Sequence, residues 1–143
     1  MSTRTRTILN WLAVLAWAGV IFGLSAQPGS RLPGGWSVEG HLGVYAVLGV
    51  LVWVALGGRS AGLRGIVLAI AVASAYGITD EFHQSFVPQR TPDVLDWLTD
   101  TVGATVAVLA AAYLSRRLAK RRAPSRTRSE APGSGSEQVG SGD

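Results

Sequence analysis

The 143-residue chain contains no cysteine, few charged residues and only two histidines. Without cysteine it can form no disulfide, no thiolate metal site and no cysteine nucleophile. Charged residues make up 15% of the chain and lie mainly between four apolar blocks, each close to the length that spans a membrane. This distribution predicts an integral membrane protein, and the chain length predicts a single domain.

The apolar blocks predict an all-α fold, a four-helix transmembrane bundle within residues 1–122. The expected helices cover residues 7–24, 41–56, 65–79 and 91–118. Thr91 is the expected N-cap of the fourth helix and Pro92 its first residue. The first block also fits a secretory signal peptide, but its apolar run is longer than usual, and we interpret it as a retained helix. The polar tail, residues 123–143, is expected to be disordered.

Small residues recur at every fourth position in the third and fourth helices. The first row is Gly65, Ala69, Ala73 and Gly77, and the second is Gly103, Ala107 and Ala111. Such rows allow two helices to approach closely. We therefore expect the third and fourth helices to pack together as an antiparallel hairpin.

The basic residues predict the orientation of the bundle. With four spans, eleven of the thirteen arginines and lysines fall on the side of the N-terminus, the turn at residues 57–64 and the tail. By the positive-inside rule this side is cytoplasmic, which predicts a multi-pass cell-membrane protein with both termini in the cytoplasm. Seven basic residues lie between Arg116 and Arg128, and such a cluster is typical of orientation and anionic-lipid signals. No aromatic platform accompanies it, which argues against nucleic-acid binding.

The opposite, extracytoplasmic side receives a short polar loop between the third and fourth helices. Residues 79–103, which include this loop, hold five of the nine acids, one histidine and one arginine. Charges this close to membrane segments are costly unless they pair or bind something. The topology also brings Ser25, His41 and Tyr45 to this side. The candidate binding residues are Ser25, His41, Tyr45, Asp80, Glu81, His83, Gln84, Arg90, Asp93, Asp96 and Asp100.

The end of the third helix carries part of this cluster. If the helix continues to Gln84, then Asp80, His83 and Gln84 share one face. Glu81 lies instead on the small-residue face, toward the fourth helix. The helix is expected to end near Pro88, because the residue before a proline avoids helical backbone angles.

The fourth helix carries the other carboxylates. Asp93, Asp96 and Asp100 recur at i, i+3 and i+7, so they form one stripe, and its continuation into small residues predicts that it faces the bundle. Acids at this depth are rare in apolar helices and indicate a site or a water-filled cavity. A simpler interpretation is that they cap the helix and pair with Arg90, which explains Asp93 well and Asp100 poorly.

Three chemical interpretations of the cluster stay open. A divalent metal could be held by the histidines and carboxylates, but the chain lacks a zinc-like spacing such as HExxH, and no cofactor is assigned. Acid/base chemistry has the candidate catalytic residues His41, Asp80, Glu81 and Asp96. The third interpretation is a polar pocket for an anionic or sugar-bearing headgroup, with Arg90 and His41 as donors.

Three motifs in this region carry a family resemblance: Asp-Glu-x-x-Gln at 80–84, Pro-x-Arg at 88–90 and Asp-x-x-Asp at 93–96. Together with IFGLSAQPGS and GHLGVYAVLG, they resemble the VanZ-like family of bacterial membrane proteins over residues 21–104. The matching positions are Ser25, His41, Tyr45, Asp80, Glu81, Gln84, Arg90, Asp93, Asp96 and Gly103. Asp100 and Glu39 stand where the family often has asparagine and lysine, so the expected pocket is more negative than in relatives.

The resemblance implies a role in the cell envelope, because the family takes its name from a protein associated with low-level resistance to the glycopeptide teicoplanin. We expect the protein to recognise or modify an envelope component, such as a lipid-linked cell-wall precursor, a phospholipid headgroup or a glycopeptide, with membrane lipids as partners. One alternative is a proton or cation pathway through Asp96 and Asp100, although no acidic or basic residue follows Asp100 before Arg116. Another is a non-catalytic membrane partner subunit.

Overall fold

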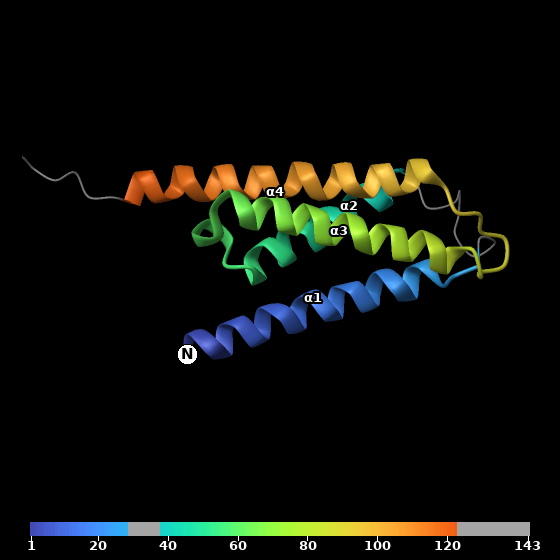
Figure 1. The fold of residues 1–143 in the computed structure, drawn as a ribbon, viewed down its shortest axis with the longest axis horizontal. Coiled ribbons are helices and arrows are strands. Elements are labelled where there is room, and N and C mark those ends of the chain that lie inside the picture. The colour runs from blue at the N-terminus through green and yellow to red at the C-terminus, as the bar shows by residue number, and fades with distance from the viewer. Residues whose placement is uncertain (29–37, 123–143) are drawn as a thin grey trace, which may run out of the picture.

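Four long α-helices form an all-α bundle in the computed structural model, which describes residues 1–28 and 38–122 (Figure 1). The helices are α1 (Thr3–Ser25), α2 (Val38–Ala55), α3 (Gly62–Gln84) and α4 (Val94–Arg122), and a short 3-10 helix, η2 (Gly58–Ala61), precedes α3. Each α-helix is long and apolar enough to cross a membrane. The prediction of an all-α fold with four helices long enough to span a membrane is thus confirmed, while the expected disordered tail lies outside the described residues.

Consecutive helices run in opposite directions, so the bundle has two chemically different ends (Figure 1). One end holds the last turn of α1, the first turn of α2 and the connection between α3 and α4. We call it the polar end, because His41 and the carboxylates of residues 80–100 lie there. The other end gathers the N-terminus, η2 and the last turns of α4, and we call it the basic end.

The outer faces of the helices are apolar. Leu15 and Leu114, for example, each expose more than half of their surface. Lipid tails solvate such faces, whereas water does not. Between the helices the packing is tight and made of small or branched residues, and Val52, Ala69 and Val108 are fully buried. The bundle therefore has a largely apolar exterior and core, and the charged side chains of the described residues lie toward its two ends.

α1 is the helix with the fewest neighbours. It packs against α2 and α3 but not against α4 in the described part of the chain. Two hydrogen bonds to backbone carbonyls fasten it: Trp17 Nε1 donates to the Val44 oxygen at 2.9 Å, and the Tyr76 hydroxyl donates to the Ala18 oxygen at 2.7 Å. Toward its N-terminus α1 diverges from the other helices (Figure 1). Only its middle and C-terminal half are therefore held to the bundle.

The closest helix approach is between α2 and α4. A Cβ atom added at Gly103 would lie 2.6 Å from the Leu42 carbonyl oxygen, and one at Gly49 would lie 3.0 Å from the Ala104 Cβ. The expected contact of α3 with α4 exists, but Gly103, the first residue of the predicted row on α4, packs against α2 and not against α3. Spacing identifies a helix face that permits close approach, and it does not identify the partner.

The start of α4 also differs from the prediction. The helix begins at Val94, and Thr91 and Pro92 precede it. Asp93 is the cap, because its Oδ1 accepts the Leu95 N–H at 2.8 Å. Its own N–H donates to Glu81 Oε2 at 2.8 Å, and this bond to α3 fixes where the helix can start.

The α2–α4 contact leads to a first prediction. Gly103→Ala should lower the free energy of unfolding by about 1–3 kcal/mol, because the new methyl group would overlap the α2 backbone. Gly43→Ala is the matched control, since its Cβ would meet nothing within 4 Å and alanine favours the helix. Thermal unfolding of both variants in detergent, followed by circular dichroism, measures the difference. Equal stability of the two variants would contradict the close approach.

Candidate functional site

The centre of the polar end is a buried contact between His41 of α2 and Asp100 of α4. Their Nδ1 and Oδ1 atoms lie 2.9 Å apart, and Asp100 is 0% exposed. With Asp100 ionised, its Oδ1 can only accept, and His41 Nδ1 is then the donor in this contact. The second imidazole nitrogen, Nε2, lies 3.8 Å from Asp96 Oδ2. His41 is thus held between the two acids that α4 presents one turn apart.

The last turn of α3 supplies a second pair of carboxylates. The Gln84 side-chain amide lies 3.4 Å from Asp80 Oδ2 and 3.4 Å from Glu81 Oε1, so one donor serves both acids. The other oxygen of Glu81 accepts the Asp93 N–H. Glu81 also lies near enough to His41 for their charges to interact. These contacts join α2, α3 and α4 into one polar cluster.

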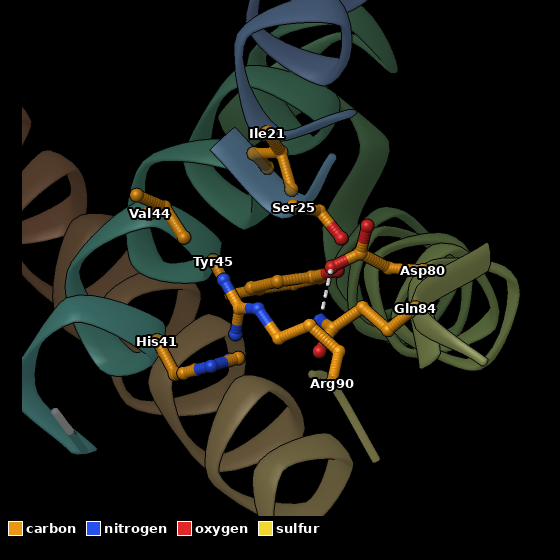
Figure 2. Close-up of a pocket in the computed structure, with 8 residues that line it drawn as sticks. All are labelled: Ile21, Ser25, His41, Val44, Tyr45, Asp80, Gln84 and Arg90. Atoms are coloured by element: carbon orange, nitrogen blue, oxygen red, sulfur yellow. Dashed lines mark hydrogen bonds between the residues drawn. The ribbon is translucent and has the colours of Figure 1, made fainter. Parts of the chain in front are cut away.

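A pocket opens beside this cluster, between α1, α2 and α3 (Figure 2). Its lining residues are Ile21, Ser25, His41, Val44, Tyr45, Asp80, Gln84 and Arg90. The hydroxyls of Ser25 and Tyr45 point toward the Asp80 carboxylate. Ser25 Oγ, the Tyr45 hydroxyl and Asp80 Oδ1 are buried and have no hydrogen-bond partner among the described residues. Each such atom costs about 1–3 kcal/mol unless water or a ligand satisfies it.

Arg90 closes one side of the pocket. Its side chain comes from the connection between α3 and α4 and reaches toward His41 and Tyr45 on α2 (Figure 2). Its Nε donates to the Gln27 carbonyl oxygen at 3.4 Å, which is a long bond. Within residues 1–28 and 38–122, no acid pairs with Arg90. The simpler interpretation was therefore wrong where it paired the acids with this arginine, although Asp93 does cap α4 as it expected. The charge of Arg90 is available to an anion.

The structure brings most of the predicted site residues together. Six line the pocket, namely Ser25, His41, Tyr45, Asp80, Gln84 and Arg90, and Glu81, Asp96 and Asp100 lie next to it in the cluster. His83 does not join them, because its ring stacks on Phe22 of α1 with the centroids 4.1 Å apart. Asp93 is exposed and caps α4 instead of facing the bundle.

Sequence reasoning missed the part that Gly77 plays in the site. A Cβ atom there would lie 3.4 Å from Asp100 Oδ2, 3.5 Å from Tyr45 Cε1 and 3.2 Å from Trp97 Cδ1. Gly77 thus leaves the space in which a carboxylate and two aromatic rings meet. Its place in the small-residue row was the available signal, but the row alone does not indicate a carboxylate beside it.

The arrangement of the side chains does not support the interpretation in which the histidines and carboxylates hold a divalent metal. Among the residues that the structure describes, no three histidine or acidic side chains are arranged to hold a metal ion. The contact of His41 with Asp100 and the amide of Gln84 satisfy part of the cluster, while Asp80 Oδ1 and Asp100 Oδ2 have no hydrogen-bond partner among the described residues.

The fold and this cluster define a class: a four-helix, multi-pass membrane protein with a polar pocket at one end of its bundle. The VanZ/LLP1 family matches residues 9–115, which is most of the chain, so the protein belongs to that family. The match confirms the resemblance and extends it beyond residues 21–104 at both ends. No curated protein and no solved structure matches the chain.

The buried contact leads to a second prediction. Asp100→Ala should destabilise the folded bundle by about 1–3 kcal/mol, because it leaves the buried Nδ1–H of His41 without its acceptor. Asp96→Ala should have a smaller effect, since the Asp96 side chain is 32% exposed and its contact with His41 is longer. Thermal unfolding in detergent ranks the two variants. A larger loss for Asp96→Ala would show that the 2.9 Å contact contributes little.

Proposed function

We propose that the protein recognises a phosphate-bearing component of the cell envelope, such as a lipid-linked cell-wall precursor or a phospholipid, at the outer face of the membrane. One observation carries the proposal: three buried oxygens without partners and an arginine without an acid share a single pocket. The outward orientation rests on the positive-inside rule, which puts the basic end in the cytoplasm.

The chemistry of the pocket suits a headgroup with both an anion and hydrogen-bond donors. Arg90 can pair with a phosphate through two parallel hydrogen bonds, because its guanidinium is a planar fork. Asp80 and the hydroxyls of Ser25 and Tyr45 can accept from ligand hydroxyl or ammonium groups. The positive and negative charges of the pocket therefore belong to different residues, since Arg90 is half-buried and Asp80 is only 4% exposed.

The size of the pocket limits what can enter it. The space open to the centre of a water molecule is about 10 Å³, which is room for about one water. Only a single polar group of a ligand fits in the pocket as it stands, so the remainder would lie outside, at the level of the lipid headgroups. The pocket therefore discriminates between ligands by the polar group at their end, because the rest of a ligand stays outside it.

A binding experiment tests the proposal. Wild-type protein in nanodiscs that contain a polyprenyl diphosphate should retain this lipid in native mass spectrometry. Arg90→Gln should reduce retention about tenfold, because a charge-assisted hydrogen bond contributes about 1.5–3 kcal/mol. Asp80→Asn should not weaken it, because a polyprenyl diphosphate carries no hydroxyl or ammonium group from which Asp80 could accept. Arg64→Gln, which removes an exposed arginine at the basic end, should have no effect.

Two outcomes of this experiment would count against recognition. Equal retention by Arg90→Gln and Arg64→Gln would assign the binding to general charge attraction. If Arg90→Gln and Asp80→Asn instead lower the amount of folded protein and no variant binds the lipid, the cluster has only the structural role of a partner subunit. Thermal unfolding of each variant separates loss of binding from loss of the fold.

Modification of the bound component is a second candidate, favoured by the contact of His41 with Asp100. A buried carboxylate that holds one imidazole nitrogen orients the other for proton transfer. The gap of 3.8 Å between His41 Nε2 and Asp96 Oδ2 exceeds a direct hydrogen bond, and a hydroxyl or a water could bridge the two. In this reaction a water would lose its proton to Nε2 as its oxygen attacks the phosphorus, and the same proton would pass to the leaving-group oxygen as the old P–O bond breaks.

His41→Gln tests this chemistry separately from binding. The variant should retain the polyprenyl diphosphate within about twofold and lose about a hundredfold or more of any conversion, the usual range for a general base. Mass spectrometry of the nanodisc lipids over time measures the conversion. If wild-type protein leaves the lipid unchanged, or if His41→Gln converts it at the wild-type rate, His41 does not act as a base on it.

The alternative of a proton or cation pathway has weaker support. In the described helices the buried polar and charged side chains all lie at the polar end, and the core beyond Asp100 consists of apolar residues such as Val52, Ala69 and Val108. A relay through the membrane needs ionisable or hydrated groups along its whole length. The groups present favour a site that is open to one side only.

A further inference from the structure

Asp80 is a buried carboxylate without a positive partner. It is 4% exposed, and no arginine, lysine or histidine within residues 1–28 and 38–122 forms an ion pair with it. The Gln84 amide approaches its Oδ2 at 3.4 Å, which is a long hydrogen bond from a neutral donor. Its Oδ1 has no hydrogen-bond partner among the described residues. A buried carboxylate is unfavourable unless a positive group lies against it, so the pocket is suited to a cation.

Two hydroxyl groups lie beside this carboxylate. Figure 2 shows Ser25 of α1 and Tyr45 of α2 pointing toward Asp80 of α3, so three helices each bring an oxygen to the same place. Ser25 is 4% exposed and Tyr45 0%, and neither hydroxyl makes a hydrogen bond within the part of the chain that the structure describes. The pocket therefore presents three buried acceptors, of which one is charged.

The space in this pocket limits which cation can enter. About 10 Å³ is open to the centre of a water molecule, which is room for about one water. A primary ammonium group is close to water in size, carries a positive charge and has three N–H donors. A hydroxyl offers one donor and no charge, whereas a trimethylammonium group has no donor and is much larger. The three acceptors and the unpaired charge of Asp80 therefore fit a primary ammonium group best.

Arg90 narrows the ligand further. It lines the same pocket and forms no ion pair with Asp80 or with any other acid of the described residues. An amine alone would be repelled by this arginine and would leave its charge without a partner. A ligand in which a short linker joins the ammonium group to a phosphate brings a cation to Asp80 and an anion to Arg90. Such a zwitterionic group satisfies both charges at once.

We propose that the pocket binds the headgroup of an aminophospholipid, such as phosphatidylethanolamine, with the primary ammonium group among the three buried oxygens and the phosphate against Arg90. This inference rests on the proposed recognition of a phosphate-bearing envelope component, and it narrows that component to one that ends in a primary amine. A lipid is the source, because the pocket lies at one end of a bundle whose helices are long and apolar enough to cross a membrane, where headgroups are concentrated.

The experiment measures the lipid preference of the full-length protein. Nanodiscs contain equal amounts of phosphatidylethanolamine, phosphatidylcholine and phosphatidylglycerol, and native mass spectrometry identifies the retained lipid. Wild-type protein should retain phosphatidylethanolamine about tenfold over each of the other two, as expected for a charge-assisted hydrogen bond. Phosphatidylcholine carries the same charges but has no N–H donor, and phosphatidylglycerol offers hydroxyl groups but no cation.

Matched variants locate the preference in the pocket. Asp80→Asn should reduce the retention of phosphatidylethanolamine about tenfold, because it removes the charge that faces the ammonium group, and Tyr45→Phe should reduce it about threefold. Asp93→Asn is the control, since it removes the same charge from an exposed position at the polar end, and asparagine can still cap α4. It should change the retention by less than about twofold.

Several results would overturn the proposal. Equal retention of phosphatidylethanolamine and phosphatidylcholine by the wild type would remove the selection for a primary amine. Equal losses for Asp80→Asn and Asp93→Asn would mean that the general negative charge of the polar end, and not the pocket, attracts the lipid. If soluble O-phosphoethanolamine displaces the lipid at a concentration no higher than that of the lipid, the source is a soluble amine. If Asp80→Asn proves unstable by thermal unfolding, Ser25→Ala takes its place, and undiminished retention there would likewise reject the site.

Failure of this inference is distinguishable from failure of the proposed function. If Arg90→Gln lowers the retention of polyprenyl diphosphate while wild-type protein shows no preference for phosphatidylethanolamine, phosphate recognition stands and only the amine selection is rejected. If Arg90→Gln changes the retention of neither lipid, phosphate recognition in the pocket is itself rejected.

Discussion

The structure depends on keeping one fully buried carboxylate, Asp100, inside a bundle whose interior is otherwise apolar. Without partners this group would be among the most unfavourable features of the fold, because an isolated charge in such surroundings costs several kcal/mol. His41 faces it at 2.9 Å, and the absence of a side chain at Gly77 leaves room for it. The close contact of α2 and α4 at Gly103 holds both partners in register. The helix packing and the polar cluster are therefore parts of one arrangement.

Much of this arrangement could be predicted from the sequence, because it follows from long-range constraints. Four apolar blocks require alternating helices, and alternation brings His41 to the same end as Asp100 although 59 positions separate them. The sequence did not predict which side chains point away from the polar cluster. His83 and Gln84 are adjacent in the sequence, yet the ring of His83 lies on Phe22 while Gln84 faces the acids. The direction in which each side chain points depends on how α3 packs against α1, and helical spacing does not indicate that packing.

The distribution of charge gives the bundle two different ends. In the described residues the acids and His41 gather at one end, while arginines such as Arg59 and Arg116 gather at the other without acids beside them. An apolar core separates the two groups, so each end must satisfy its charges locally or with molecules from its own side of the membrane. The basic residues that give the sequence its orientation signal are thus the same residues that distinguish this end of the bundle from the other.

The attachment of α1 has a consequence for access to the polar pocket. Ile21 and Ser25 form one wall of the pocket, and both belong to a helix that has no contact with α4 and is bound through the carbonyls of Ala18 and Val44. None of the contacts among His41, Asp100, Glu81 and Gln84 involves this helix. A tilt of α1 alone would widen an opening that now admits about one water, and it would leave the charged centre undisturbed. A movement of α1 is therefore the change that would let the pocket hold more than the single polar group that it admits in this structure.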